Sequence, residues 1–416
     1  MHKRGPNSII VAQQSHSAAK ISIPHYSAGK RKPPTASSTA WLSHLTCSKM
    51  QQFLERLWDL LKACLAFLQS LRGKNHIYFE STKMSVVLDT SAASLSGDGG
   101  SSGGGGTLGE GAFATVYRAR DKFDPSKYYA VKKMFLQSPE FERSLYQEVD
   151  SFQRFKHANI LRLIDSQVTA ADASNGGQKV AYLLFPLMRR GTLRDELNRT
   201  IFKPTAQNPL GSRMGLRGPR ALAKILSDFL GVVSAFNVLH THSPAYVHQD
   251  IKPENILIAD DGTPLLTDFG SVRLADISIT NRAQSLAVAD EAASFCTISY
   301  RAPELFDPPK GTKLDTRTDV WGMGCLLFAW WYGHSPVECE FSESESGSFK
   351  VRVVECSHSR VLARIPRPPP KMATPEDTVV QEICEWVLER NPAVRVFTAD
   401  VMMRLRDALV EVDDKV

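Results

Sequence analysis

The stretch YVHQDIKPENILI, from Tyr246 to Ile258, constrains the fold more than any other part of the sequence. It brings a carboxylate, an ammonium group and an amide together within a few residues, on Asp250, Lys252 and Asn255, between two apolar ends. Such a concentration of polar groups indicates a chemical site. The rest of the chain has to supply the partners that this site would need.

The composition sets broad limits on the class of protein. At 416 residues the chain is long enough for one large two-part domain with extensions, or for two or three small domains. Its hydrophobic fraction of 43% is that of a globular protein, and a formal net charge of +6 is too modest to argue for a nucleic-acid partner. The 7 cysteines are scattered and form no C-x-x-C pair, which disfavours a disulfide framework or a zinc site and favours a reducing compartment.

The N-terminal part of the chain differs in texture from the rest. Residues 1–49 contain no Asp or Glu and are rich in Ser, Lys and Arg. This composition fits an organelle-targeting address, but a disordered basic extension, or a start codon placed too far upstream, is the favoured interpretation. The chain opens with Met1 and His2, so it lacks the Met-Gly start that myristoylation requires.

A helix is expected over residues 50–73. Apolar residues recur there at three- and four-residue steps, and Gly73 follows Arg72 where a helix would stop. Charged residues interrupt the apolar run, so it is too short to span a membrane. The apolar face could contact a membrane surface, but packing against the domain or a partner is the favoured alternative.

Residues 74–106 are interpreted as a linker, because they end in the Gly/Ser-rich stretch SLSGDGGSSGGGG. The sequence LGEGAFATVYRA follows, from Leu108 to Ala119, and Gly109, Gly111 and Val116 fit a phosphate-binding loop of the type G-x-G-x-x-G-x-V. Glycines let backbone N–H groups approach phosphates closely. Ala114 holds the third glycine position. Alone, this pattern fits a glycine-rich hairpin as well.

Two charged residues follow the glycine-rich stretch at workable intervals. The β-prone run YYAVKKM contains Ala130 and Lys132, in the pattern of a strand whose lysine contacts nucleotide phosphates. A lysine in that position needs a counter-ion, and Glu148, in a helix expected over 144–155, is the candidate. Taken alone, Glu148 reads as an ordinary surface residue.

Further motifs complete an ordered series. PLLTDFGSVRLAD contains Asp268, CTISYRAPELF contains Glu304, DVWGMGCLLFAWWYG begins at Asp319, and RNPAVRVF contains Arg395. In this order, the chain from Thr107 to about Val412 resembles the eukaryotic protein kinases. The resemblance implies an α+β, two-lobed kinase fold over 107–412, with a small β-rich lobe and a larger, mainly helical lobe. It also implies a buried ion pair between Glu304 and Arg395.

The resemblance assigns the chemistry of ATP-dependent transfer to serine or threonine hydroxyls of protein substrates. Asp250 would accept or orient the substrate hydroxyl, and Lys252 would neutralise charge on the γ-phosphate. Asn255 and Asp268 would supply oxygen ligands for Mg²⁺. Lys252 and Thr297 fit the pattern of serine/threonine kinases, because the threonine lies where it can contact Asp250.

The resemblance also assigns the ATP-binding residues. Lys132, held by Glu148, would contact the α- and β-phosphates. At the hinge, Phe185 would be the gatekeeper, and adenine would be read by the carbonyl of Pro186 and the backbone N–H of Met188. The remaining residues implied to bind ATP are Leu108, Gly109, Gly111, Val116 and Ala130.

Within the kinases, the sequences CTISYRAPELFD and DTRTDVWGMGCLL are similar to the Numb-associated kinase family, and closest to its acylated, Golgi-associated branch. That family carries a helix in the activation segment, for which 285–295 is the counterpart because it is Ala-rich and lacks Gly and Pro. A cytoplasmic protein is expected, with a Golgi or endomembrane surface, peripheral membrane contact, or an organelle reached through the basic N-terminus as alternatives.

Two rival functions and one regulatory hypothesis follow from the same residues. A pseudokinase scaffold is disfavoured because all of the invoked catalytic residues are present. A nucleic-acid-binding protein is disfavoured because the basic N-terminus lacks interleaved aromatic residues and a recognition motif. Gln249 stands where kinases usually have Arg before the catalytic aspartate, so we expect activity that needs no phosphorylation of the activation segment.

Overall fold

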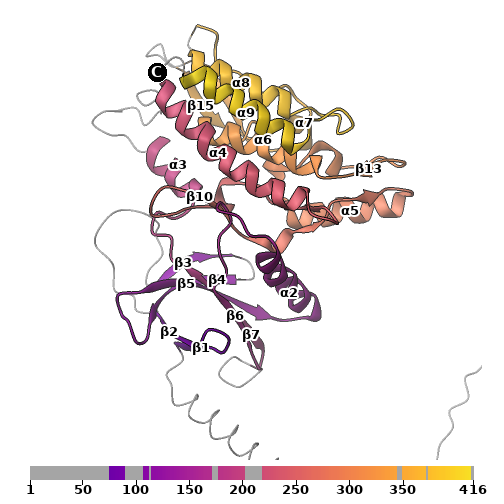
Figure 1. The fold of residues 1–416 in the computed structure, drawn as a ribbon. Coiled ribbons are helices and arrows are strands. Elements are labelled where there is room, and N and C mark those ends of the chain that lie inside the picture. Colours follow the sequence, from indigo (N-terminus) through magenta and orange to yellow (C-terminus); the bar gives the residue numbers. More distant parts are fainter. Residues whose placement is uncertain are drawn as a thin grey trace, which may run out of the picture. The chain divides into compact units, whose positions relative to one another are not determined.

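The computed structural model describes residues in one compact unit, Ser70–Val416. The described ranges are 75–89, 106–111, 114–170, 177–201, 218–343, 349–371 and 373–413. The extension expected over 1–49 and the helix expected over 50–73 lie outside them. In Figure 1 the longer strands gather in one region and most helices in another, as expected of an α+β fold.

The β-rich region is one antiparallel sheet (Figure 1). Its strands are β1 (His76–Phe79), β2 (Met84–Leu88), β3 (Thr107–Glu110), β4 (Ala114–Asp121), β5 (Tyr128–Leu136), β6 (Asp165–Thr169) and β7 (Lys179–Pro186). The order across the sheet is β1-β2-β4-β5-β7-β6, and β3 pairs with β4. Strand β5 therefore lies between β4 and β7, which fixes the position of its lysine.

Strands β2 and β3 share one edge of β4. Strand β2 pairs with the C-terminal half of β4, and β3 pairs with its N-terminal half. Between them, the backbone N–H of Asp89 donates to the carbonyl of Arg118 at 2.9 Å, and the N–H of Arg118 donates to the carbonyl of Gly106 at 2.7 Å. The ladder thus runs from β2 into β3 without a gap, so the chain leaves and re-enters the sheet at the same point of β4.

The prediction of a linker over 74–106 is wrong for the part that forms β1 and β2. Phe79 and Val86 are fully buried, and they lie in a hydrophobic cluster with residues of β4, β5 and β7. Thr82, in the β1–β2 turn, donates to the Asp165 carboxylate of β6 through its backbone N–H at 2.9 Å and its hydroxyl at 2.8 Å. The sheet begins at His76 rather than near Thr107, because β1 and β2 form a hairpin and β2 pairs with β4 beyond the Gly/Ser-rich stretch.

Helix α2 (Pro139–Arg154) packs on the sheet region and on the segment that follows Asp268. Its sequence favours a helix there: Pro139 opens it, acidic residues occupy the first turn, and Arg154 lies in the last turn, where the helix dipole favours a cation. The buried face carries Glu148 and Phe152. The helix expected over 144–155 is the C-terminal part of this longer element.

The helical region is built around α6. Its helices are α3 (Leu193–Ile201), α4 (Pro219–His240), α5 (Arg282–Phe295), α6 (Arg317–Tyr332), α7 (His358–Val361), α8 (Pro375–Val387) and α9 (Thr398–Asp413). Every residue of α6 from Asp319 to Tyr332 is buried, and α6 packs on α8 while α4 packs on α9. Within the described ranges, α4 alone has the length and apolar composition of a membrane span, and half of that window is buried in the protein.

Short two-stranded sheets complete the region next to the site. They pair β8 (Tyr246–Val247) with β11 (Arg273–Leu274), β9 (Ile256–Ile258) with β10 (Pro264–Leu266), β12 (Ile277–Ser278) with β13 (Lys313–Leu314), and β14 (Cys339–Glu343) with β15 (Phe349–Val353). The first two of these sheets flank the stretches that carry Asp250 and Asp268.

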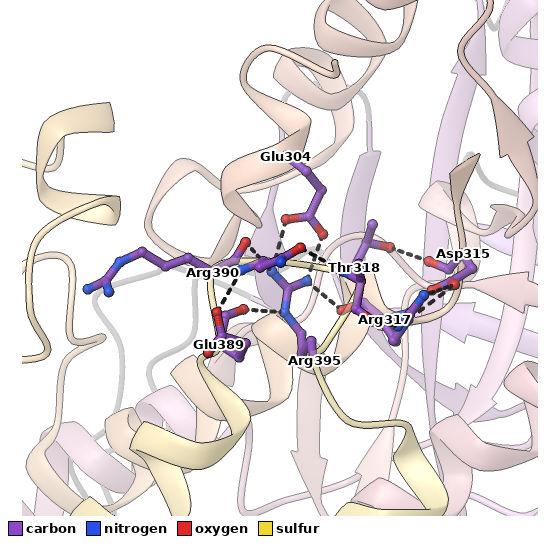
Figure 2. A network of polar contacts seen from close by, with 9 residues as sticks. Glu304, Asp315, Arg317, Thr318, Glu389, Arg390 and Arg395 are labelled. Carbon is purple, nitrogen blue, oxygen red and sulfur yellow. Dashed lines mark hydrogen bonds and ion pairs between the residues drawn. The ribbon is translucent and has the colours of Figure 1, made fainter. Parts of the chain in front are cut away.

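The predicted ion pair between Glu304 and Arg395 is confirmed (Figure 2). The two guanidinium Nη atoms of Arg395 lie 2.6 Å and 2.9 Å from the two carboxylate oxygens of Glu304. Arg395 also donates to the carbonyls of Glu389 at 2.7 Å and Arg317 at 2.8 Å. Both charged side chains are almost completely buried, and these added hydrogen bonds satisfy the guanidinium donors.

Candidate active site

Three charged side chains meet between strand β5 and helix α2. The Nζ of Lys132 lies 2.7 Å from Oε1 of Glu148 and 3.1 Å from Oδ1 of Asp268. Burial opposes the charge on Lys132, but the two carboxylates outweigh it and raise the pKa of the lysine. The charge of Lys132 in turn lowers the pKa of Asp268. The arrangement keeps a lysine cation and the Asp268 carboxylate ionised side by side.

Glu148 and Asp268 differ in their surroundings. The side chain of Glu148 is 2% exposed, whereas that of Asp268 is 45% exposed. Burial raises the pKa of Glu148, although Lys132 opposes this. The buried carboxylate thus serves to hold the lysine, and the exposed one is available to a ligand. Asp268 has a left-handed backbone, with φ 61°, which is uncommon for a non-glycine residue.

The carboxylate of Asp250 contacts each of the other catalytic-loop candidates. Its Oδ1 accepts from the hydroxyl of Thr297 at 2.7 Å and from the backbone N–H of the same threonine at 3.2 Å. Its Oδ2 lies 2.7 Å from Nζ of Lys252 and 3.0 Å from Nδ2 of Asn255. Lys252 also donates to the Thr297 hydroxyl at 3.0 Å. Thr297, predicted from a separate motif, is therefore brought together with the three residues of the catalytic-loop stretch.

The backbone of this loop is held by Asp319 at the start of α6. One carboxylate oxygen of Asp319 accepts from the backbone N–H of His248 at 2.6 Å, and the other accepts from that of Gln249 at 3.0 Å. His240 of α4 contacts the same carboxylate through Nε2 at 3.0 Å. Gln249 has a left-handed backbone, with φ 69°. Asp319 was recognised from the sequence only as the head of an apolar helix, and its anchoring role was missed.

A row of aromatic rings connects the two regions behind the charged groups. The ring of Phe152 lies 5.2 Å from that of Phe185 and 4.7 Å from that of Phe269. The ring of Phe269 lies 5.5 Å from that of His248. All four side chains are buried. The row therefore couples helix α2 and strand β7 to the catalytic loop by packing, a role that sequence reasoning did not assign.

The remaining ATP-site candidates line the β-rich side. Leu108 is 45% exposed, and Gly109 and Gly111 are also exposed, on the hairpin of β3 and β4. The N–H of Gly111 donates to the carbonyl of Ala114 at 2.8 Å, which closes this hairpin with alanine in the third glycine position. Val116 lies half-buried on β4, paired with Lys132 of β5.

The hinge candidates follow the end of β7. Phe185 is buried, whereas Pro186 and Met188 are half-buried. Ala130 pairs with Phe185 across β5 and β7, and Ala130 and Met188 both pack on the surface of the main hydrophobic core. The sequence-predicted apolar residues Ala130 and Phe185 thus lie on neighbouring strands, and Lys132 follows Ala130 on the same strand.

The oxygen donors suit a magnesium ion better than a transition metal. Within the described ranges, no group of three or more His, Cys, Asp or Glu side chains is placed to hold a metal by itself. Asp268 offers an exposed carboxylate. Asn255 directs its amide nitrogen to the Asp250 carbonyl at 2.8 Å, which turns its amide oxygen away from that carbonyl. Mg²⁺ is commonly bound by one or two protein oxygens together with substrate phosphates, and this donor set fits that pattern.

Comparisons with known proteins identify the family of the chain. The protein kinase domain model matches residues 104–404. Serine/threonine-protein kinase 16 of Rattus norvegicus is 35% identical over 245 residues, which cover 59% of this chain and 74% of that protein. A probable serine/threonine-protein kinase of Dictyostelium discoideum is 33% identical over 330 residues, covering 64% of this chain and 83% of that protein.

The chain belongs to the protein kinase family. The match over most of the chain, together with serine/threonine-protein kinases among its relatives, confirms the predicted activity, transfer of a phosphoryl group to serine or threonine. The described strands and helices are consistent with the fold of that family.

Proposed function

We propose that the residues around Asp250 and Asp268 carry out phosphoryl transfer from MgATP. The observation that supports this most strongly is the electrostatic link between two charged sets, because Lys252 next to Asp250 also lowers the pKa of Asp268. Lys132, Glu148 and Asp268 form the first set, and Asp250 with its partner Thr297 belongs to the second. Phosphoryl transfer depends on positioning and on stabilising charge, and these two sets supply both.

On the nucleotide side, Lys132 would hold the α- and β-phosphates, and the backbone of the β3–β4 hairpin would cover them. Adenine would lie against the half-buried apolar residues Ala130 and Met188, which pack on the core. Bound Mg²⁺ would neutralise phosphate charge, with Asp268 and Asn255 as its protein ligands. The left-handed backbone of Asp268 and its contact with Lys132 would keep the carboxylate aimed at this position.

On the substrate side, the hydroxyl oxygen of serine or threonine would attack the γ-phosphorus. The bond from that phosphorus to the β,γ-bridging oxygen breaks, and ADP leaves. Asp250 would orient the hydroxyl and accept its proton, and Lys252 would stabilise negative charge on the transferred group. Thr297, which touches both side chains, would hold them in register.

Two single substitutions separate these roles. Asp268→Asn should abolish transfer and weaken Mg²⁺-dependent ATP binding, because it removes the metal ligand. Asp250→Asn should abolish transfer but leave ATP affinity near that of the wild type, because Asp250 acts on the acceptor. Titration calorimetry with MgATP and a peptide phosphorylation assay measure the two quantities. Wild-type turnover in either variant would contradict the assignment.

We further propose that the chain lies in the Numb-associated branch of the kinases and acts in the cytoplasm, with contact to an endomembrane surface as the alternative. The similarity to serine/threonine-protein kinase 16 supports the branch. The apolar residues of 50–73 would supply the membrane contact in that alternative. Replacing Leu57, Leu61 and Leu65 with Ser should then release the full chain from sedimented vesicles, and unchanged partition would contradict the contact.

A further inference from the structure

Arg273 makes several contacts near the active site, and no catalytic role has been assigned to it. It lies on β11, a few residues after Asp268. Its Nε lies 3.1 Å from Oε1 of Glu291, a residue of helix α5. Its Nη1 donates to the carbonyls of Gly270 at 3.1 Å and Val272 at 2.8 Å. The guanidinium therefore ties α5 to the backbone that directly follows Asp268.

The same guanidinium covers the C-terminal end of α5. Its Cζ lies 4.5 Å from the ring centroid of Phe295, the last residue of that helix. The hydroxyl of Ser271 reaches the Phe295 carbonyl at 3.5 Å, and Arg301 donates to the Cys296 carbonyl at 2.9 Å. Polar contacts from both sides thus hold the chain immediately before Thr297.

Helix α5 has little apolar packing of its own. Ser285 and Ala292 are its only fully buried residues, and Leu286 is 48% exposed. Helices in proteins are stabilised mostly by packing of a buried face, so α5 gains little from this source and its end contacts matter more for its position. At the N-terminal end, Asn281 caps the helix by accepting from the N–H of Gln284. At the C-terminal end, Arg273 supplies the largest set of contacts.

We propose that the Arg273–Glu291 pair positions the activation segment without phosphorylation. Kinase activation segments are commonly ordered when a phosphorylated residue pairs with arginine. Here a carboxylate already present in α5 pairs with the arginine. The pair fixes the end of α5, and this places Thr297 against Asp250. Glu291 and Arg273 are positioning residues in this scheme, and the inference rests on the catalytic role proposed for Asp250.

The environment of Gln249 is consistent with this proposal. Its side chain is neutral and lines a small cavity together with Arg301 and Tyr300. Within the part of the chain that the structure describes, its Oε1 is buried without a hydrogen-bond partner. The catalytic loop therefore presents no cation at residue 249 that could receive a phosphate, whereas the cation that holds the segment, Arg273, is already paired.

The test uses full-length protein made in bacteria together with a phosphatase, with its unphosphorylated state verified by mass spectrometry. Glu291→Gln should lower kcat for a serine peptide by about tenfold, because it removes one charge-assisted contact that positions the acceptor site. ATP affinity and the unfolding midpoint should change little, since the side chains of the pair are 19% and 39% exposed. Hydrogen exchange of the α5 amides should become faster.

Two further variants make the result specific to this pair. Glu385→Gln removes the partner of Arg367, from an ion pair whose carboxylate is similarly exposed, and it should keep wild-type kcat. Arg273→Glu combined with Glu291→Arg should be more active than Arg273→Glu alone. The rescue should be partial, because the exchanged pair loses the donation to the carbonyls of Gly270 and Val272.

Three outcomes would overturn the proposal. They are wild-type kcat in Glu291→Gln, equal activity of the exchanged pair and Arg273→Glu alone, and a large loss of wild-type activity on dephosphorylation that preincubation with ATP restores. Failure of the catalytic assignment itself is distinguishable, because the wild type would then transfer no phosphate in either phosphorylation state.

Discussion

The two sides of the active site are held in different ways. On the helical side, the catalytic loop is tied to Asp319, which is 2% exposed and heads a helix buried along almost its whole length. On the sheet side, Lys132 is 17% exposed and the glycine-rich hairpin is open to solvent. The comparison teaches that the backbone of the catalytic loop is anchored in the core, whereas the hairpin that would cover a nucleotide lies at the surface.

The largest loss of folding stability is expected from a change on the helical side. Asp319→Ala removes the acceptor of two backbone N–H groups, and each buried donor left without a partner costs about 1–3 kcal/mol. We expect a fall of several kcal/mol in the free energy of unfolding, measured by urea denaturation. Asp276→Ala, which removes an exposed partner of Lys313, is the matched control and should change stability little. Equal stability of the two variants would contradict the comparison.

On the sheet side we expect a smaller loss of folding stability, and one that depends on pH. Lys132→Met should abolish phosphoryl transfer and leave Glu148 buried without its cation. Burial already raises the pKa of Glu148 above its ordinary value of 4.5, and loss of Lys132 removes the opposing effect. A carboxyl whose pKa is raised in the folded state stabilises the fold in acid and loses that contribution as the pH rises through the raised pKa.

The stability of Lys132→Met should therefore fall, relative to the wild type, as the pH rises from acid towards neutrality. Urea denaturation across this range measures it. The double variant Lys132→Met with Glu148→Gln is the control and should lose this pH dependence. A stability difference that is constant with pH would show that Glu148 does not depend on Lys132 for its charge.

The smallest change in function is expected from a deletion between strands β2 and β3. Asp89 and Gly106 hydrogen-bond to the same residue of β4, so deletion of 90–105 with Asp89 joined to Gly106 should leave the β2–β3 ladder continuous. We expect ATP affinity and turnover close to those of the wild type. Deletion of 75–105, which also removes the two buried strands, should destabilise the domain. Loss of ATP binding in the shorter deletion would show that residues 90–105 contribute to the site.

The sequence predicted the residues of the site better than the strands and contacts that hold those residues in place. Asp250, Lys252, Asn255 and Asp268 lie in short local motifs, because each role demands a particular functional group at a particular spacing. Strands β1 and β2 were missed because β4, the strand that joins their hairpin to the sheet, lies beyond a Gly/Ser-rich stretch that follows them. The Arg273–Glu291 contact was missed for a related reason, since it depends on how α5 is oriented.

One supporting contact could be predicted, because each of its two residues lies in a recognisable motif. Glu304 and Arg395 were assigned to each other through the family resemblance, and the structure places them in contact. The aromatic row through Phe152 and Phe269 could not be assigned in this way. Buried rings in separate elements give no local signal that distinguishes a continuous row from ordinary core residues.

The most direct test of the central claim is the transfer of label from γ-labelled ATP to a peptide containing serine, threonine and tyrosine. The wild-type chain should label serine or threonine in the presence of Mg²⁺, and EDTA should abolish the labelling. Asp250→Asn should bind MgATP but transfer no label. Binding of MgATP by the wild type without labelling of any peptide or protein substrate would contradict the account and favour a pseudokinase.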